Sequence, residues 1–143
     1  MPTSDAAARL VIHTDGGARG NPGPAAFGYV ICNSDGEKVE GRGEFIGETT
    51  NNVAEYKGMI AAAKRTVELG ADAAEFRVDS ELLERQIKGR YRVKAPHLKP
   101  LFAQLMAALE QIPEWRVCHV RREHNTEADE LANRAMDARG SVT

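Results

Sequence analysis

The first third of the chain contains short apolar runs interrupted by glycines, prolines and turn residues, which is typical of strands joined by turns and loops. Residues 9–14 form an apolar, β-branched run, and glycines and prolines crowd residues 15–24, which predicts a strand followed by a loop. Residues 25–32 and 38–46 also have strand composition and are joined by a turn at residues 34–37. The pattern therefore predicts three strands, of which the second and third form a hairpin.

Beyond residue 50 the apolar positions recur every three or four residues, which is the spacing of one helix face. Helices are predicted over residues 53–67, 80–88, 98–112 and 126–139, and Gly70, Gly89 and Pro113 mark the ends of the first three. Strands over residues 74–79 and 115–120 alternate with these helices. The predicted order of elements is therefore β-β-β-α-β-α-α-β-α.

This order predicts an α/β fold. Strands joined by short turns pair antiparallel, whereas strands that alternate with helices pair parallel. We therefore expect one five-stranded mixed sheet flanked by helices on both faces. Residues 1–143 are expected to form a single domain, with its core at about residues 9–137 and short flexible termini.

Length and composition exclude several classes of protein. The chain has 143 residues, of which 42% are hydrophobic and 28% charged, so it can bury a core without disulfides or structural zinc. Cys32 and Cys118 form no metal-binding pair and are expected to be core thiols. No apolar stretch approaches the ~20 residues that span a membrane, and the N-terminus has no signal sequence. We expect a cytoplasmic monomer with no membrane association and no obligate protein partner.

Four acidic residues stand where predicted strands end or predicted helices begin: Asp15, Glu55, Asp79 and Asp129. Each has an ordinary structural explanation, as a turn residue or in a helix cap. Together they indicate a site, because the carboxyl ends of parallel strands form the ligand crevice of open α/β sheets. Carboxylates gathered there repel one another unless a cation holds them, and without His or Cys they favour Mg²⁺ or Mn²⁺. This chemistry is typical of phosphoryl transfer.

Short motifs surround these acidic residues: TDGG at 14–17 with GNPGP at 20–24, TTNN at 49–52 before Glu55, VDS at 78–80 and ADELA at 128–132. They closely resemble the motifs of ribonuclease H type 1, the endonuclease family that cuts the RNA strand of RNA/DNA hybrids. The resemblance extends from about residue 9 to about residue 135. The predicted order of elements is also that of the ribonuclease H-like fold.

The resemblance implies that Asp15, Glu55, Asp79 and Asp129 bind two Mg²⁺ ions, for which Mn²⁺ could substitute. One ion would activate the attacking water and the other would stabilise the leaving 3′ oxygen, leaving a 5′-phosphate and a 3′-hydroxyl. Glu55 would also contact a ribose 2′-hydroxyl, which distinguishes RNA from DNA. The other positions implied to contact the hybrid are Gly16, Gly17, Asn21, Asn51, Asn52 and Ser80.

Two of these segments have a second interpretation. The glycine-rich stretch at residues 16–24 does not match a nucleotide-binding phosphate loop, since a strand follows it where a helix should begin. As a flat backbone surface it suits a minor groove, because glycine amides approach sugars and phosphates closely. Asn51 and Asn52 are equally well explained as helix caps, and both roles are compatible.

The sequence departs from the family pattern at a histidine. Many members carry a catalytic histidine on a flexible loop before the last aspartate, but here that loop is short and His124 lies close to Asp129. His124 either assists proton transfer or product release, or is a surface histidine. His119 falls in a predicted strand and is expected to be structural.

A second departure concerns the basic helical protrusion that some members carry. Residues 89–97 are too short for it, yet they keep Arg90, Arg92 and Lys94 in a chain whose net charge is -2. A solvated loop is one explanation, and contact with phosphates is the one we favour. Glu81 stands where many members have Gln, which puts the hydrogen bonds of that position in doubt.

Two alternatives to hybrid cleavage follow from the same fold. The chain could be a hybrid-binding module that does not cleave, but this would require the loss of a metal ligand and all four acidic residues are present. It could also be a nuclease that acts on another duplex, such as double-stranded RNA.

Overall fold

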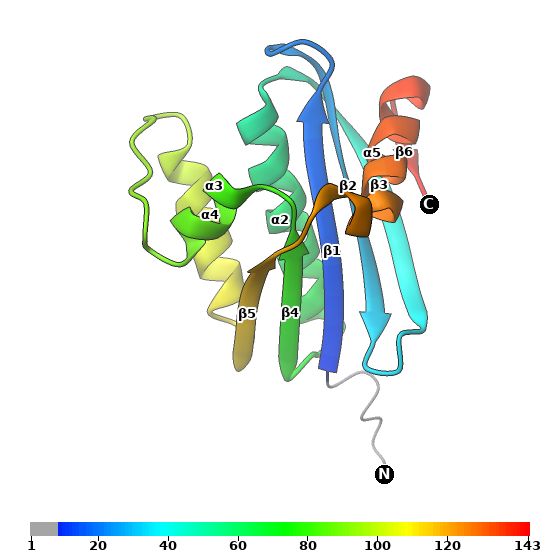
Figure 1. Ribbon diagram of the computed structural model, residues 1–143, viewed down its shortest axis with the longest axis vertical. Coiled ribbons are helices and arrows are strands. Elements are labelled where there is room, and N and C mark those ends of the chain that lie inside the picture. Colours follow the sequence, from blue (N-terminus) through cyan, green and yellow to red (C-terminus); the bar gives the residue numbers. More distant parts are fainter. Residues whose placement is uncertain (1–8) are drawn as a thin grey trace.

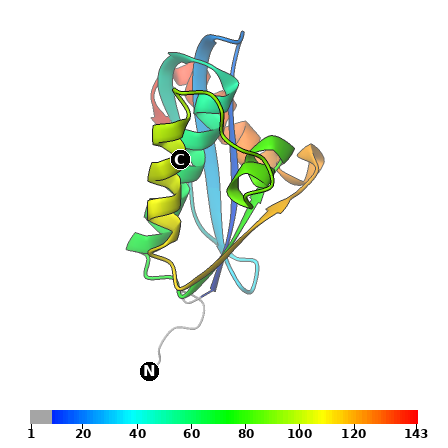
Figure 2. The same ribbon diagram turned by 90° about the vertical axis from the view of Figure 1, so that its left-hand side faces the viewer.

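A central mixed sheet organises the computed structural model, which describes residues 9–143. Helices α2 and α4 cover one face of the sheet and α5 covers the other (Figures 1 and 2). The elements are β1 (Arg9–Ala18), β2 (Gly23–Asn33), β3 (Lys38–Thr49), α2 (Asn51–Glu68), β4 (Ala73–Val78), α3 (Glu81–Ile87), α4 (Lys99–Leu109), β5 (Glu114–His119), the 3-10 turn η1 (Arg122–His124), α5 (Thr126–Ala138) and β6 (Ser141–Val142). This confirms the predicted mixed sheet with helices on both faces.

Strand β1 lies at the centre of the sheet, whose strand order is β5-β4-β1-β2-β3-β6. It pairs antiparallel with β2 and parallel with β4, and β4 pairs parallel with β5. The main core fills the space between the sheet and α2 and α4, where Ile12, Met59, Phe76, Leu105 and Leu109 are fully buried. Burial of these side chains provides most of the driving force for this arrangement.

The predicted loop over residues 15–24 is wrong in its first part. Strand β1 continues through Asp15 to Ala18, and its residues pair with β2 as far as Ala18↔Ala25. Glycine disfavours strands intrinsically, but pairing with a neighbouring strand overrides this preference. As a result, Asp15 is held within a paired strand.

The predicted strand count of five is also wrong. The two-residue strand β6 pairs antiparallel with β3 at Gly43 and Glu44, which makes six. Val142 packs against a small second cluster of apolar side chains that includes Ala26 and Met136. The C-terminus is therefore part of the sheet and not a loose tail. The expected flexible N-terminal segment lies outside the described residues.

Two glycines let helices approach the sheet closely. A Cβ on Gly16 would lie 2.4 Å from the Ala54 carbonyl oxygen in α2, and one on Gly28 would lie 2.3 Å from the Ala128 carbonyl oxygen in α5. Any larger residue would push these helices away, because backbone atoms cannot give way. Glu55 and Asp129 each follow one of the contacted residues, so these contacts set how near their backbones lie to the sheet.

Two further expectations concern the surface. Cys32 and Cys118 are free thiols, but both are only half-buried, so neither is the core residue that was predicted. Among the described residues, none of the helices has the length and hydropathy needed to cross a bilayer.

Candidate active site

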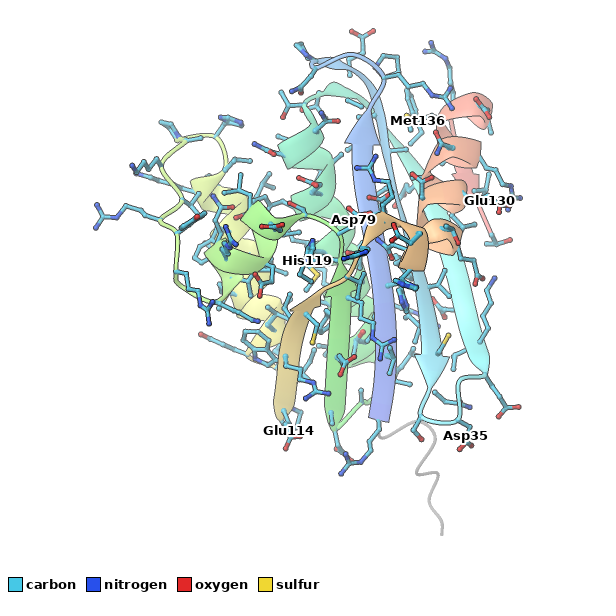
Figure 3. The ribbon with its side chains drawn as sticks, viewed as in Figure 1. Asp35, Asp79, Glu114, His119, Glu130 and Met136 are labelled. Carbon is cyan, nitrogen blue, oxygen red and sulfur yellow. The ribbon has the colours of Figure 1, made fainter. Side chains whose placement is uncertain are left out.

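The four predicted acidic residues meet in one groove. Asp15 lies on β1, and Asp79 follows Val78, the residue of β4 that pairs with Thr14. Glu55 comes from α2 and Asp129 from the first turns of α5. All four line a groove of about 510 Å³, here called the carboxylate groove. Figure 3 shows Asp79 above the end of β4, beside β1 and the start of α5.

The electrostatics of the carboxylate groove centre on Asp15. Burial raises the pKa of Asp15 to about 8, helped by the charge of Asp79 and by a hydrogen bond with Asp129. Burial likewise raises the pKa of Glu55 to about 7, although a hydrogen bond from Ser80 and the nearby Arg122 lower it. In the metal-free protein the site therefore holds protons near neutral pH, because several carboxylates cannot be charged side by side.

The donor set fits Mg²⁺ better than a metal that needs a closed protein cage. Within residues 9–143, no group of three or more His, Cys, Asp or Glu side chains converges on one point closely enough to hold an ion. Mg²⁺ does not require such a cage, because it keeps several of its waters and takes one or two carboxylates together with substrate phosphates. Crowded carboxylates with raised pKa values are the charge distribution that a divalent cation relieves.

The helix-cap explanations fail for two of the four acidic residues. Thr50 caps α2 by accepting a hydrogen bond from the Val53 amide, so Glu55 takes no part in a capping box. In the described chain α5 has no side-chain cap at its start, so Asp129 is not part of a box either. Ser80 does cap α3, accepting from the Leu83 amide at 3.2 Å. Glu55 and Asp129 are thus left without the structural roles considered for them.

Asn21, Asn51 and Asn52 lie at or beside the edge of the carboxylate groove, here called its rim. Asn51 and Asn52 are exposed and line the groove, but neither is the helix cap that was suggested, since Thr50 takes that place. Asn51 Oδ1 accepts a hydrogen bond from the Ala18 amide at 2.7 Å. Asn21 Oδ1 accepts from the Asn51 amide at 3.0 Å, so Asn21 supports the rim without lining the groove.

The glycines and Ser80 also lie at the carboxylate groove. Gly16, Gly17 and Ser80 line it beside Asp15 and Glu55. Gly16 faces the backbone of α2, whereas a Cβ on Gly17 would meet only Asn51 Oδ1, at 3.6 Å. Gly16 is therefore required for the close packing of α2 against β1, whereas Gly17 leaves space in the carboxylate groove.

The histidines are not brought to the carboxylates. His124 is exposed in η1 and lines a separate pocket with His13, Cys32 and Glu127. His119, labelled in Figure 3, is exposed at the end of β5, the strand in which it was predicted. Neither side chain lines the carboxylate groove.

For the hybrid cleavage that the resemblance implies, we expect His124→Ala to lower the rate by no more than ~100-fold. A positioned proton-transfer group contributes ~10²- to 10⁴-fold, and His124 faces another pocket. Rates at saturating substrate between pH 6 and pH 9, for wild type and variant, measure this. A loss as large as that of Asp129→Asn would show that His124 reaches the reacting phosphate.

The predicted basic residues lie apart from the carboxylate groove. Arg90, Arg92 and Lys94 are exposed in the segment between α3 and α4, which Figure 1 shows on the outer side of these helices, and none of them lines the groove. In the same region Glu81 forms an ion pair with Arg85 at 3.1 Å. Glu81 stands where many family members have Gln, and this ion pair is the contact that it makes there.

Sequence reasoning missed two residues of the site. Arg122 lines the carboxylate groove and lowers the pKa of Glu55. Asn125 is 1% exposed and donates a hydrogen bond to Asp79. The sequence signals that could have indicated them are the basic pair Arg121-Arg122 before α5 and Asn125 at its start. Both patterns are common on protein surfaces.

Comparisons with known proteins show the family of the chain. The family described as "Reverse transcriptase-like" matches residues 13–135. The chain is 46% identical over 131 residues to "Bifunctional protein Rv2228c" of Mycobacterium tuberculosis, covering 91% of this chain and 36% of that protein. It is 41% identical over 133 residues to "Ribonuclease HI" of Halobacterium salinarum, covering 93% and 67%. The chain thus spans only about a third of the mycobacterial relatives that it matches.

A solved structure gives the same result in three dimensions. The structure of LC11-RNase H1 in complex with an RNA/DNA hybrid has a TM-score of 0.85 and 45% sequence identity, covering 90% of this chain and 97% of that one. The ribonuclease H-like fold is thereby confirmed, and the chain belongs to the ribonuclease H type 1 family.

Proposed function

We propose that the chain is an endonuclease that hydrolyses the RNA strand of RNA/DNA hybrids and leaves a 5′-phosphate and a 3′-hydroxyl. The observation that carries this proposal is the meeting of four carboxylates from β1, α2, the end of β4 and α5 in one groove. A relative of 45% identity has been solved with such a hybrid, which supports the choice of substrate.

The residues at the rim of the carboxylate groove are suited to contact the minor groove of a duplex that carries 2′-hydroxyls. Asn51 and Asn52 have exposed side-chain amides at the start of α2. Gly17, on the neighbouring β1, has no side chain that would cover them. Such amides bond to sugars and base edges in the wide, shallow minor groove of a duplex with A-like geometry. Glu55, at the same rim, is the acceptor that we assign to the ribose 2′-hydroxyl.

Two Mg²⁺ ions, or Mn²⁺ in their place, would be held by the four carboxylates and would supply activation of the attacking water and stabilisation of the leaving 3′ oxygen. Asp15 would be the central ligand, because the charges of Asp79, Asp129 and Glu55 all act on it. Arg122 adds a positive charge beside Glu55 and is suited to hold a backbone phosphate.

The test uses end-labelled RNA/DNA hybrid, RNA/RNA duplex and DNA/DNA duplex of one sequence, each with Mg²⁺ or with EDTA. We expect cleavage of the RNA strand of the hybrid alone, only with Mg²⁺, and products whose 3′ ends a polymerase can extend. Cleavage of the RNA/RNA duplex at an equal rate would favour the wider substrate range. Binding without cleavage would favour a hybrid-binding module.

We expect Arg90, Arg92 and Lys94 to contact phosphates outside the carboxylate groove. Replacing all three with Ala should reduce the slope of log K against log salt by roughly two to three units, since each phosphate contact releases about one counterion. Hybrid binding is measured in Ca²⁺ at several salt concentrations. An unchanged slope would mean that this segment is a solvated loop.

The proposal concerns this chain and not the longer mycobacterial relatives. From the sequence we also propose that it acts as a monomer in the cytoplasm, without a membrane or an obligate protein partner. Light scattering after size-exclusion chromatography, with and without hybrid, tests the oligomeric state.

A further inference from the structure

Asn125 is a buried polar residue in an exposed segment. It is 1% exposed, although Arg121, Glu123 and His124 before it and Thr126 after it are all exposed. A polar side chain is rarely buried so completely unless its hydrogen bonds repay the lost hydration. Asn125 therefore has a specific task at the junction of η1 and α5.

The hydrogen bonds of Asn125 connect three of the four acidic positions. Its Nδ2 donates to the Thr14 carbonyl oxygen at 2.8 Å, directly before Asp15 on β1. The same Nδ2 donates to Asp79 Oδ2 at 3.3 Å. Its backbone carbonyl accepts from the Asp129 amide at 3.2 Å, in the first turn of α5. One residue thus ties together the segments that carry Asp15, Asp79 and Asp129.

Helix capping does not explain the side chain. Asn125 occupies the position before α5 where asparagine normally caps with its side chain, but within the described chain α5 receives no such hydrogen bond. The side chain is directed instead at β1 and Asp79. The ordinary stabilising role of asparagine at this position is given up for these two contacts.

The orientation of the amide is determined by its partners. Nδ2 meets two oxygen acceptors, so exchanging the amide nitrogen and oxygen would place oxygen against oxygen. Asn125 Oδ1, in turn, is buried without a hydrogen-bond partner among the residues that the structure describes. A buried acceptor without a partner costs stability, which offsets part of what the two donated hydrogen bonds contribute.

We propose that Asn125 is a positioning residue that sets the separation of Asp15, Asp79 and Asp129. Its carboxamide fixes one oxygen of Asp79 and holds the start of α5 against β1, leaving the other oxygen of Asp79 for a ligand. Side chains that orient metal-binding carboxylates in this way govern metal affinity and turnover without touching the substrate. The consequence for catalysis rests on the function proposed above.

The test compares Asn125→Ala and Asn125→Asp with the wild-type protein. Alanine removes both donated bonds, whereas aspartate keeps the shape but places an acceptor against two acceptors. For both variants we expect kcat on the hybrid to fall ~10- to 100-fold, as is usual for residues that orient metal ligands. KM should stay within about twofold, because the rim that binds the duplex is unchanged.

Binding of Mn²⁺ to the protein without nucleic acid, followed by calorimetry, is the second measurement. We expect it to weaken by ~10-fold or more in both variants. This measurement remains informative if the wild-type protein does not cleave hybrids, so failure of the proposed function and failure of this inference can be told apart. Mn²⁺ affinity within twofold of wild type in both variants would overturn the role of Asn125.

Thr66→Val is the matched control. Thr66 is 0% exposed and donates one buried hydrogen bond to the Ala62 carbonyl within α2, and it does not line the carboxylate groove. We expect it to lower the melting temperature while leaving kcat and Mn²⁺ affinity unchanged. If Thr66→Val lost as much kcat as the Asn125 variants, the effect would be one of general stability and the inference would be wrong. Asn125→Asp keeps the comparison possible if Asn125→Ala does not fold.

Discussion

Asp15→Asn is expected to abolish cleavage while leaving the fold intact. Asp15 interacts electrostatically with the other three carboxylates, so it would be a principal ligand of the proposed ions. A neutral amide cannot play that part, and we expect kcat to fall at least ~1,000-fold, which corresponds to about 4 kcal/mol of transition-state stabilisation. Single-turnover cleavage of the hybrid in Mg²⁺ measures the loss, and near-wild-type cleavage would refute the four-carboxylate assignment.

The same substitution should stabilise the metal-free protein at alkaline pH. The folded pKa of Asp15 is about 8, above its ordinary value of 3.8, so the folded state binds a proton that the unfolded state has already lost. Stability from this group is therefore present at low pH and disappears as the pH rises from about 4 towards 8. In EDTA at pH 8 we expect Asp15→Asn to melt several degrees above wild type, and the difference should vanish near pH 4.

Asp35→Asn provides the control for this pH dependence. Asp35 lies on the exposed turn between β2 and β3, far from the carboxylate groove in Figure 3. Its substitution should leave the difference in melting temperature between pH 4 and pH 8 as in wild type. If Asp15→Asn showed no greater effect than Asp35→Asn, carboxylate crowding would not be what destabilises the metal-free protein.

Gly16→Ala should have the second largest effect, on stability and activity together. The added Cβ would lie 2.4 Å from the Ala54 carbonyl oxygen and 2.7 Å from the Glu55 amide nitrogen, so α2 has to move away from β1. Overpacking of this kind costs about 2–3 kcal/mol, and the shift would also displace Glu55 from the other carboxylates. We expect a melting temperature lowered by roughly 5–10 °C and a severe loss of kcat.

Gly17→Ala tests whether this effect is specific to the packing side of β1. Its Cβ would meet only Asn51 Oδ1, at an ordinary contact distance of 3.6 Å. The melting temperature of Gly17→Ala should stay within about 2 °C of wild type, since surface substitutions without a clash cost little. An equal loss of stability in both variants would point to strand propensity and not to the contact with α2.

The sequence predicts most of the fold because local patterns and tertiary structure agree over most of the chain. The apolar run at residues 25–32 and the helical spacing after residue 50 correspond to β2 and α2. The disagreement falls at residues 15–18, where glycines predict a loop but pairing with β2 produces a strand. Such pairing depends on a distant partner, so local propensity cannot reveal it.

The same distinction explains the site. Asp79, Glu55 and Asp129 could be located because the first follows a strand and the other two stand near helix starts, places that the sequence pattern locates. Asp15 was expected at a strand end, but it lies within β1, which continues to Ala18. Arg122 and Asn125 could not be located, since their roles depend on which side chains they meet across the sheet. For His124 the sequence left a catalytic role and a surface role open, and the structure places it in another pocket.

The order of the four acidic residues along the chain has a consequence for biosynthesis. Asp15, Glu55 and Asp79 emerge from the ribosome before Asn125 and Asp129, which stand directly before and within α5. Until α5 docks on β2, the growing chain lacks one carboxylate and the residue that joins the others. The hybrid cleavage proposed above would therefore require α5 to have docked on β2, because only then do all four carboxylates line one groove.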